Sequence, residues 1–136
     1  MKIRNWLILL VMVGLLAPSG AALAAKQVAY ISVDTLKTLL GFQDALIIDV
    51  RAPKDWDQSD RKIKGAVRQD PKQVKAWASK LDKDKEIVLY CAFPNEGTSA
   101  RVAQEMMEMG FTAVEVLKGG WKAWEAAKYP TEPKGK

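Results

Sequence analysis

The alternation of short apolar runs with stretches of helical spacing most limits what this chain can fold into. Apolar residues run almost unbroken through 45–50, 87–90 and 113–117, with a briefer run at Tyr30-Ile31. Continuous runs of this kind are typical of parallel strands that are buried on both faces. Because helical patterns separate the runs, the sequence predicts an α/β sandwich with a mostly parallel sheet.

The predicted helices have recognisable ends. Ser32 is a good N-cap for a first helix, which Gly41 ends. The stretch 52–64 is expected to be polar and irregular, with Trp56 packed against the core or, as the weaker alternative, stacked on a ligand. Three further helices are predicted over 71–81, from 98 or 99 to 109, and over 121–127.

The first 24 residues have the pattern of a cleaved signal peptide. Lys2 and Arg4 precede an apolar run, and Ala22-Leu23-Ala24 offers a small-x-small cleavage site. The run is short for a membrane span, so an uncleaved anchor is the weaker alternative. No cysteine lies near the cleavage point, which excludes a lipoprotein. We therefore expect a periplasmic or secreted protein with one domain over 25–130 and a basic, frayed tail over 131–136.

Charge and residue usage exclude several functions. The net charge is +5, and cleavage would remove Lys2 and Arg4 but no acidic residue, which leaves +3. The lysines are interleaved with Asp and Glu, as on a solvated surface, so a nucleic-acid partner is not expected. The chain has no histidine, which excludes Cys-His and Ser-His dyads and most transition-metal sites. We expect no metal and no other cofactor.

Cys91 is the only cysteine, and its position favours chemistry. It follows the run 87–90 and precedes a loop that leads into a helix. Ligands bind at this edge of a parallel sheet, and a helix start offers N–H groups that stabilise a thiolate. A single cysteine in an exported protein indicates a reactive thiol or an intermolecular bond. The plainer alternative is a small buried hydrophobic side chain.

Four stretches of the chain resemble the rhodanese-like family. Leu-Ile-Ile-Asp-Val-Arg over 46–51 looks like the family's strand that ends in Asp-Val-Arg, and Ile-Lys-Gly-Ala over 63–66 looks like its Ile-Pro-Gly-Ala segment. Val-Leu-Tyr-Cys over 88–91 is similar to the strand with the nucleophilic cysteine, and 117–124 is similar to the closing Gly-Gly-x-x-x-Trp motif. The resemblance implies a three-layer rhodanese-like sandwich, with a central mostly parallel sheet flanked by helices.

The resemblance also implies that Cys91 accepts a sulfane sulfur as a persulfide and passes it to a thiol or to cyanide. A thiolate is a strong nucleophile, and both sulfur anions gain from N–H groups that converge on them. Ser99 is placed to donate its hydroxyl to the sulfur or to cap the helix. Arg51 is expected to attract an anionic donor at the pocket mouth or, alternatively, to form a structural ion pair. The expected main-chain cradle is Ala92, Phe93, Pro94, Asn95, Glu96, Gly97 and Thr98.

The cysteine loop departs from the common rhodanese form. Thr98 stands where an arginine precedes the serine, and the loop is two residues longer. Glu96 adds a negative charge, which is expected to disfavour the thiolate and anionic donors such as thiosulfate. Phosphatases of this fold have a lengthened Cys-x5-Arg loop, but Gly97 stands at the arginine position and Arg101 lies further along. Phosphatase activity is therefore disfavoured.

Three functions remain, in order of preference. The first is an exported sulfurtransferase that uses a small sulfur donor and a thiol or cyanide acceptor. The second is a rhodanese-fold binding or redox-sensing module with weak catalysis. The third is a thiol oxidoreductase, which would need a partner because the chain has no resolving cysteine. We expect a monomer, and a redox or membrane protein partner is left open.

Overall fold

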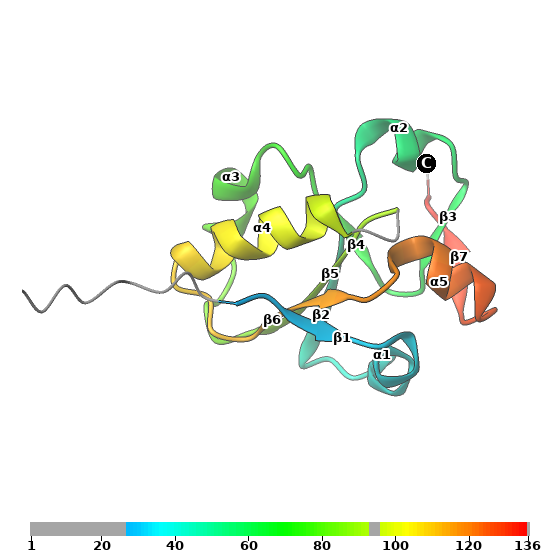
Figure 1. Cartoon of the computed structure of the whole chain (residues 1–136), viewed down its shortest axis with the longest axis horizontal. Helices are drawn as coiled ribbons and strands as arrows, with labels where there is room; N and C mark the ends of the chain where they lie inside the picture. Colours follow the sequence, from blue (N-terminus) through cyan, green and yellow to red (C-terminus); the bar gives the residue numbers. More distant parts are fainter. Residues whose placement is uncertain (1–26, 93–95, 136) are drawn as a thin grey trace, which may run out of the picture.

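A five-stranded parallel sheet forms the centre of the computed structural model, which describes residues 27–92 and 96–135 (Figure 1). The strands lie in the order β1-β6-β5-β2-β4, and every neighbouring pair is parallel. This confirms the sheet predicted from the apolar runs. The strands are β1 (Ala29–Ile31), β2 (Ala45–Asp49), β4 (Val67–Arg68), β5 (Glu86–Tyr90) and β6 (Val114–Leu117).

Helices cover both faces of the sheet, as a sandwich requires (Figure 1). Side chains of α3 and α4 pack on one face, and side chains of α1 and α5 pack on the other. Ser32 caps α1 as predicted, because its hydroxyl accepts the N–H of Thr35 at 3.1 Å. The helices are α1 (Val33–Leu39), α2 (Pro53–Asp57), α3 (Val74–Ala78), α4 (Gly97–Glu108) and α5 (Gly120–Ala126).

The central strand β5 shows why the run from Ile87 to Tyr90 is apolar. Ile87 and Leu89 pack in the core beside α3 and α4, whereas Val88 and Tyr90 pack in the core beside α1 and α5. All four residues are fully buried, since a strand in the middle of a covered parallel sheet has no face toward solvent. Cys91 directly follows this strand.

The stretch 52–64 is more regular than its polar composition suggests. Pro53 opens α2, where its missing N–H costs no helical hydrogen bond, and does not break the chain. β3 (Arg61–Ile63) follows and pairs antiparallel with β7 (Thr131–Pro133). The expected frayed tail thus contributes a strand, because the backbone groups of β3 need partners outside the main sheet.

The helix expected from Pro71 begins later, at Val74. Asp70 Oδ1 accepts the N–H of Lys72 at 2.8 Å, and this local bond holds the chain in a turn before the helix. Trp77 is buried, as its helical spacing predicts, and its Nε1–H donates to the Asp70 backbone oxygen at 2.8 Å.

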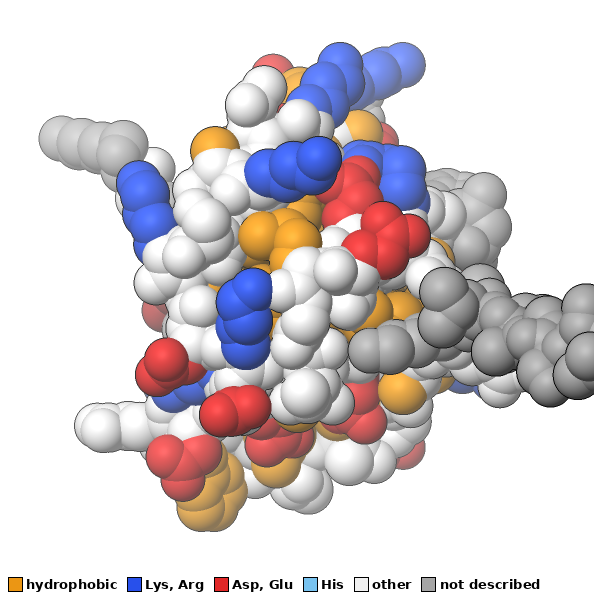
Figure 2. All heavy atoms as spheres, turned by 90° about the vertical axis from the view of Figure 1, so that its left-hand side faces the viewer, with side chains coloured by type: hydrophobic (Ala, Val, Ile, Leu, Met, Phe, Trp, Pro, Cys, Tyr) orange, Lys and Arg blue, Asp and Glu red, His pale blue; other side chains and the backbone are white. Residues whose placement is uncertain are grey.

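All five strands of the sheet run the same way, so their carboxyl ends share one edge. The helices α2 and α5 and the β3–β7 pair lie around that edge (Figure 1). Figure 2 shows the opposite end of the molecule, where acidic side chains lie mostly in the lower half of the view and lysines and arginines mostly in the upper half. Among the helices within the described ranges, none is long and apolar enough to cross a membrane.

Candidate active site

Cys91 lies in the middle of the carboxyl edge of the sheet, directly after β5. That strand has β6 on one side and β2 on the other, so the ends of three strands surround the cysteine. The residue is 5% exposed. Its carbonyl oxygen accepts the N–H of Trp121 at 2.8 Å, which fixes the backbone that carries the sulfur.

The sulfur of Cys91 faces the beginning of α4. Ser99 lies in the first turn of this helix, is buried, and places its Oγ 3.2 Å from Cys91 Sγ. The first N–H groups of a helix lack partners within the helix, and the positive end of the helix dipole lies there. Proteins commonly place reactive cysteines at such helix starts.

The Ser99 hydroxyl has two neighbours for its single proton. It donates to the backbone oxygen of Glu96 at 3.1 Å, and it lies 3.2 Å from Cys91 Sγ. With a protonated sulfur, S–H can donate to Oγ while O–H stays on Glu96; with a sulfur anion, O–H can turn toward it. Glu96 occupies the N-cap position, so the alternative in which Ser99 caps the helix does not describe this geometry.

The structure describes four of the seven residues of the predicted cradle. Ala92 is buried beside the cysteine, Glu96 and Thr98 are half-buried, and Gly97 is exposed at the first position of α4. Phe93, Pro94 and Asn95, which complete the predicted cradle, lie outside the described residues.

Glu96 has a left-handed backbone with φ +45°, which is uncommon for a residue other than glycine. Its side chain does not cap α4. Instead, Oε1 accepts the backbone N–H of Gly119 at 2.5 Å. The sequence predicts only an effect of the Glu96 charge on the thiolate. In the structure, the same carboxylate also joins the start of α4 to the residue before α5.

Arg51 is fully buried and forms an ion pair with Asp49, with 2.7 Å between Nη2 and Oδ2. Its Nη2 also donates to the backbone oxygen of Arg61 at 2.9 Å. The guanidinium carbon lies 4.6 Å from the ring centre of Trp121, which favours burial of the cation. Among the described residues Nη1 has no hydrogen-bond partner. This is the structural ion pair of the sequence analysis, and it places the cation inside the protein.

Tyr90 completes the polar network below the site. Its hydroxyl donates to Asp49 Oδ2 at 2.6 Å and accepts the N–H of Ile63 at 3.2 Å. Burial, followed by the neighbouring Asp49 carboxylate, raises the pKa of Tyr90, so it remains a neutral donor. The network joins β2, β3 and β5 next to the cysteine.

A cleft of about 310 Å³ lies beside Cys91. Ala92 and Trp121 form its wall on the cysteine side, and the chain after α2 together with α5 forms the rest. No three His, Cys, Asp or Glu side chains within residues 27–92 and 96–135 are grouped to hold a metal ion. The charged residues of the lining are Asp55, Asp60, Glu125 and Lys122, so its charge is negative on balance.

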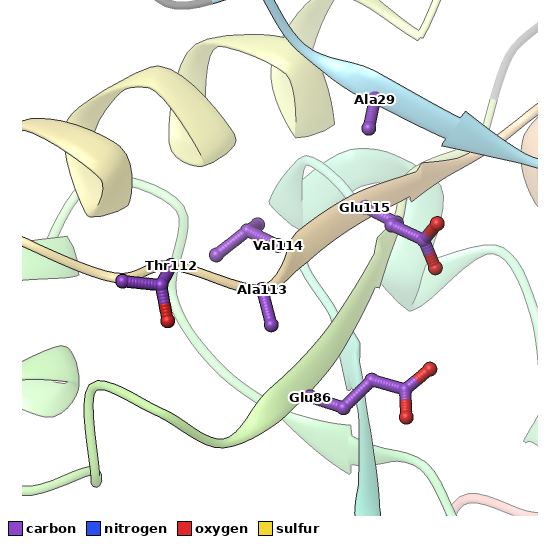
Figure 3. A pocket seen from close by; sticks show the side chains of 6 residues that line it. All are labelled: Ala29, Glu86, Thr112, Ala113, Val114 and Glu115. Atoms are coloured by element: carbon purple, nitrogen blue, oxygen red, sulfur yellow. The ribbon is translucent and has the colours of Figure 1, made fainter.

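A second hollow, of about 340 Å³, lies at the amino ends of the strands (Figure 3). Its lining includes Glu86 on β5 and Glu115 on β6, and Figure 3 shows both carboxylates on the same side of the sheet. Cys91 lies at the other end of β5, so this hollow is separate from the candidate site.

Sequence reasoning did not assign residues 119–121, the turn end and first residues of α5, to the site. Gly120 has φ +59°, and a Cβ there would lie 2.4 Å from the Cys91 backbone oxygen, so only glycine lets this turn contact the cysteine. The available signal was a pair of glycines one residue after a predicted parallel strand. The carboxyl end of such a strand must share the edge where Cys91 lies.

These features define a parallel α/β domain with a buried cysteine between its central strand and a helix start. The sequence model of the rhodanese-like domain family matches residues 32–127. The chain therefore belongs to the rhodanese-like family.

Two curated relatives are similar over much of the domain. The thiosulfate sulfurtransferase GlpE of Coxiella burnetii (strain RSA 331) is 32% identical over 95 residues, which cover 69% of this chain and 83% of that protein. The uncharacterized protein YqhL of Bacillus subtilis (strain 168) is 36% identical over 84 residues, or 62% of this chain. The match spans 64% of YqhL, just under two thirds of its length.

Solved structures have the same fold. The rhodanese-like domain of the Anabaena protein Alr3790 has 29% identity and a TM-score of 0.67, over 79% of this chain and 80% of that one. RPA3614 of Rhodopseudomonas palustris, described as a protein of unknown function and possible tyrosine phosphatase, has 27% identity and a TM-score of 0.67, over 77% and 85%. These neighbours confirm the predicted rhodanese-like sandwich.

Proposed function

We propose that this protein is a sulfurtransferase that carries sulfane sulfur as a persulfide on Cys91. The observation that carries the proposal is the buried cysteine at the end of the central strand, with Ser99 Oγ 3.2 Å from its sulfur at the start of α4. This arrangement stabilises an anion on sulfur without a histidine base. The family and the Coxiella relative, which is named a thiosulfate sulfurtransferase, support this class of reaction.

The proposed reaction has two substitution steps at sulfur. The Cys91 thiolate attacks the outer sulfur of the donor, a Cys91 S–S bond forms, and the donor's S–S bond breaks to release a thiolate or sulfite. An acceptor thiolate or cyanide then attacks the outer sulfur of the Cys91 persulfide. The product is a new persulfide or thiocyanate, and the electron pair of the broken bond returns to Cys91 as thiolate.

The cleft charge bears on the choice of donor. Its lining carries three carboxylates against one ammonium group, and Thr98 stands where the common loop has a cation. A doubly charged anion such as thiosulfate is repelled by such a lining more strongly than a persulfide or hydropolysulfide of lower charge. We therefore propose persulfides and polysulfides as better donors than thiosulfate.

Release of thiocyanate tests the proposal. Protein loaded with a small persulfide (R–S–SH) or with inorganic polysulfide, and then mixed with cyanide, should release about one equivalent of thiocyanate per Cys91. Cys91→Ser should release none while its fold is unchanged, because oxygen replaces the only sulfur that can hold the persulfide. Equal release by Cys91→Ser would contradict the assignment.

The second candidate is a rhodanese-fold binding or redox-sensing module. It is favoured by the absence of an arginine in the loop over 92–98, and a lack of repeated turnover would support it. Phosphoryl transfer has weaker support. Arg101, the arginine that follows the loop, donates to the Pro71 backbone oxygen at 2.8 Å and pairs with Glu105.

We also propose that the mature chain begins at Ala25, is a monomer and acts in the periplasm or outside the cell. Cleavage and export are supported by the charged start, apolar run and cleavage pattern over 2–24, a segment outside the described residues. Expressed with its own leader, the protein recovered from the periplasm should have the mass of residues 25–136. Recovery of only the full-length mass in the membrane fraction would support the uncleaved anchor instead.

A further inference from the structure

Residues 119–121, where the turn after β6 meets the start of α5, hold both ends of the segment that runs from Cys91 to α4. At one end, the N–H of Trp121 donates to the Cys91 carbonyl oxygen at 2.8 Å. At the other end, the N–H of Gly119 donates to Glu96 Oε1 at 2.5 Å. The first contact uses only backbone, but the second depends on the Glu96 side chain.

The backbone of Glu96 indicates that this contact is maintained against a local cost. A residue with a Cβ is strained at φ +45°, and glycine would avoid that strain. A hydrogen bond between a carboxylate and a backbone N–H is about twice as strong as one between neutral groups. The side chain thus supplies an interaction that glycine at this position would lack.

The same residue also sets the position of Ser99. The Glu96 backbone oxygen accepts the Ser99 hydroxyl at 3.1 Å and the Ala100 N–H at 2.8 Å. Ser99 Oγ in turn lies 3.2 Å from Cys91 Sγ. A movement of Glu96 would therefore move the hydroxyl that faces the sulfur.

We propose that Glu96 is a positioning residue, whose carboxylate fastens the start of α4 to Gly119 and thereby holds the Ser99 hydroxyl against the Cys91 sulfur. This positioning serves catalysis only if Cys91 transfers sulfur as proposed above. It differs from the effect expected from sequence, in which the charge of Glu96 disfavours the thiolate.

Two substitutions separate the two roles. Glu96→Gln removes the charge and keeps an oxygen that can accept the Gly119 N–H. Glu96→Gly removes the acceptor of the Gly119 N–H. Because glycine adopts positive φ without strain, a lower reactivity in this variant reports the lost contact and not added backbone strain. Glu108→Gln, at an exposed position of the same helix, is the matched control for charge. The readout is the rate of Cys91 alkylation by iodoacetamide from pH 5 to 10, together with the thermal midpoint of each variant.

We expect Glu96→Gln and Glu108→Gln to remain within about twofold of the wild-type rate at pH 7. Glu96→Gly should be about fivefold slower, with its alkylation midpoint at higher pH, as expected from a lost hydrogen bond. Wild-type rates in Glu96→Gly, or faster alkylation in both Glu96 variants, would overturn the positioning role. Failure of the wild type to accept sulfur would overturn the proposed function and leave this comparison valid, because alkylation needs only the thiol.

Discussion

The proton of the Ser99 hydroxyl can follow the charge on the sulfur. The hydroxyl lies 3.1 Å from the Glu96 backbone oxygen and 3.2 Å from Cys91 Sγ. It can therefore accept from the thiol and donate to the anion without any movement of the backbone. This gives the site a hydrogen bond that is strongest when the sulfur is charged, which is the property that a nucleophile without a base requires.

Ser99→Ala should weaken the reactivity of Cys91 without changing the fold. A hydrogen bond to a charged group contributes about 1.5 kcal/mol, so the alkylation rate at pH 7 should fall by about tenfold and the alkylation midpoint should move to higher pH. Iodoacetamide kinetics from pH 5 to 10 measure this. Ser79→Ala, an exposed hydroxyl at the end of α3, should follow the wild-type profile. An unchanged profile in Ser99→Ala would exclude the hydroxyl from the site.

At the residue scale, local pattern predicted Cys91 and Ser99 because both lie on one strand–loop–helix unit. The placement of Arg51 remained open, since only the fold shows that Asp49 and Trp121 surround it. The contact between Glu96 and Gly119 was not predicted. These residues lie 23 positions apart, and no sequence period joins them.

At the scale of elements, the turn between β6 and α5 is packed directly on the backbone of Cys91. Gly119 and Gly120 both have positive φ, and Gly120 lies so close to Cys91 that no Cβ fits. The start of α5 therefore acts as a support for the cysteine, and the closing family motif has a structural explanation in this chain.

Gly120→Ala should destabilise the protein and disturb the cysteine. The added Cβ would meet the Cys91 oxygen at 2.4 Å, in addition to the cost of positive φ. Gly65→Ala is the matched control, because Gly65 also has positive φ (+81°) but has no atom within 4 Å of the added Cβ. Urea denaturation should show a loss of about 1 kcal/mol for Gly65→Ala and at least about 2 kcal/mol for Gly120→Ala. Equal losses of unfolding free energy in the two variants would mean that the contact with the Cys91 oxygen adds nothing to the cost of a Cβ at Gly120.

Elements with a clear apolar pattern were predicted, and elements in polar stretches were not. The strands β2, β5 and β6 follow from apolar runs, because a covered parallel strand has no polar face. In contrast, α2, β3 and β7 lie in polar stretches that have neither an apolar run nor an apolar period. The pairing of β3 with β7 also joins segments about 70 residues apart.

At the scale of the whole molecule, the two ends of the sheet differ in chemistry. The carboxyl edge holds the cysteine, the Gly-Gly turn and a buried polar network. The amino edge holds the hollow of Figure 3, with Glu86 and Glu115 on neighbouring strands. Partial burial, followed by repulsion from Glu86, raises the pKa of Glu115. The folded state therefore holds this proton more tightly than the unfolded state does.

Stability should depend on pH accordingly. A carboxyl group whose pKa is raised by folding contributes stability at low pH, and this contribution is lost as pH rises through the folded-state pKa. Glu115→Gln should thus be more stable than wild type at pH 7, by about 0.5 kcal/mol or less for this partly exposed group, and equal to it near pH 4. Urea denaturation at the two pH values measures the difference, with Glu108→Gln as control. Destabilisation at pH 7 would contradict the assigned repulsion.

The overall architecture could be predicted because strand and helix patterns alternate along the whole domain. The cleft beside Cys91 could not, since Asp60, Trp121 and Glu125 come together only when α2 and α5 lie at the same edge. Its negative charge is a property of the fold that neither composition nor the net charge of the chain reveals.

The intact mass of residues 25–136 after incubation with a sulfur donor tests the central proposal most directly. With a small persulfide or inorganic polysulfide, the mass should increase by one sulfur atom, and cyanide should remove the gain as thiocyanate. Thiosulfate should load the protein less, and Cys91→Ala should gain nothing. No gain with any donor, from a folded protein whose thiol is alkylated normally, would contradict the sulfurtransferase proposal and favour the binding or sensing module.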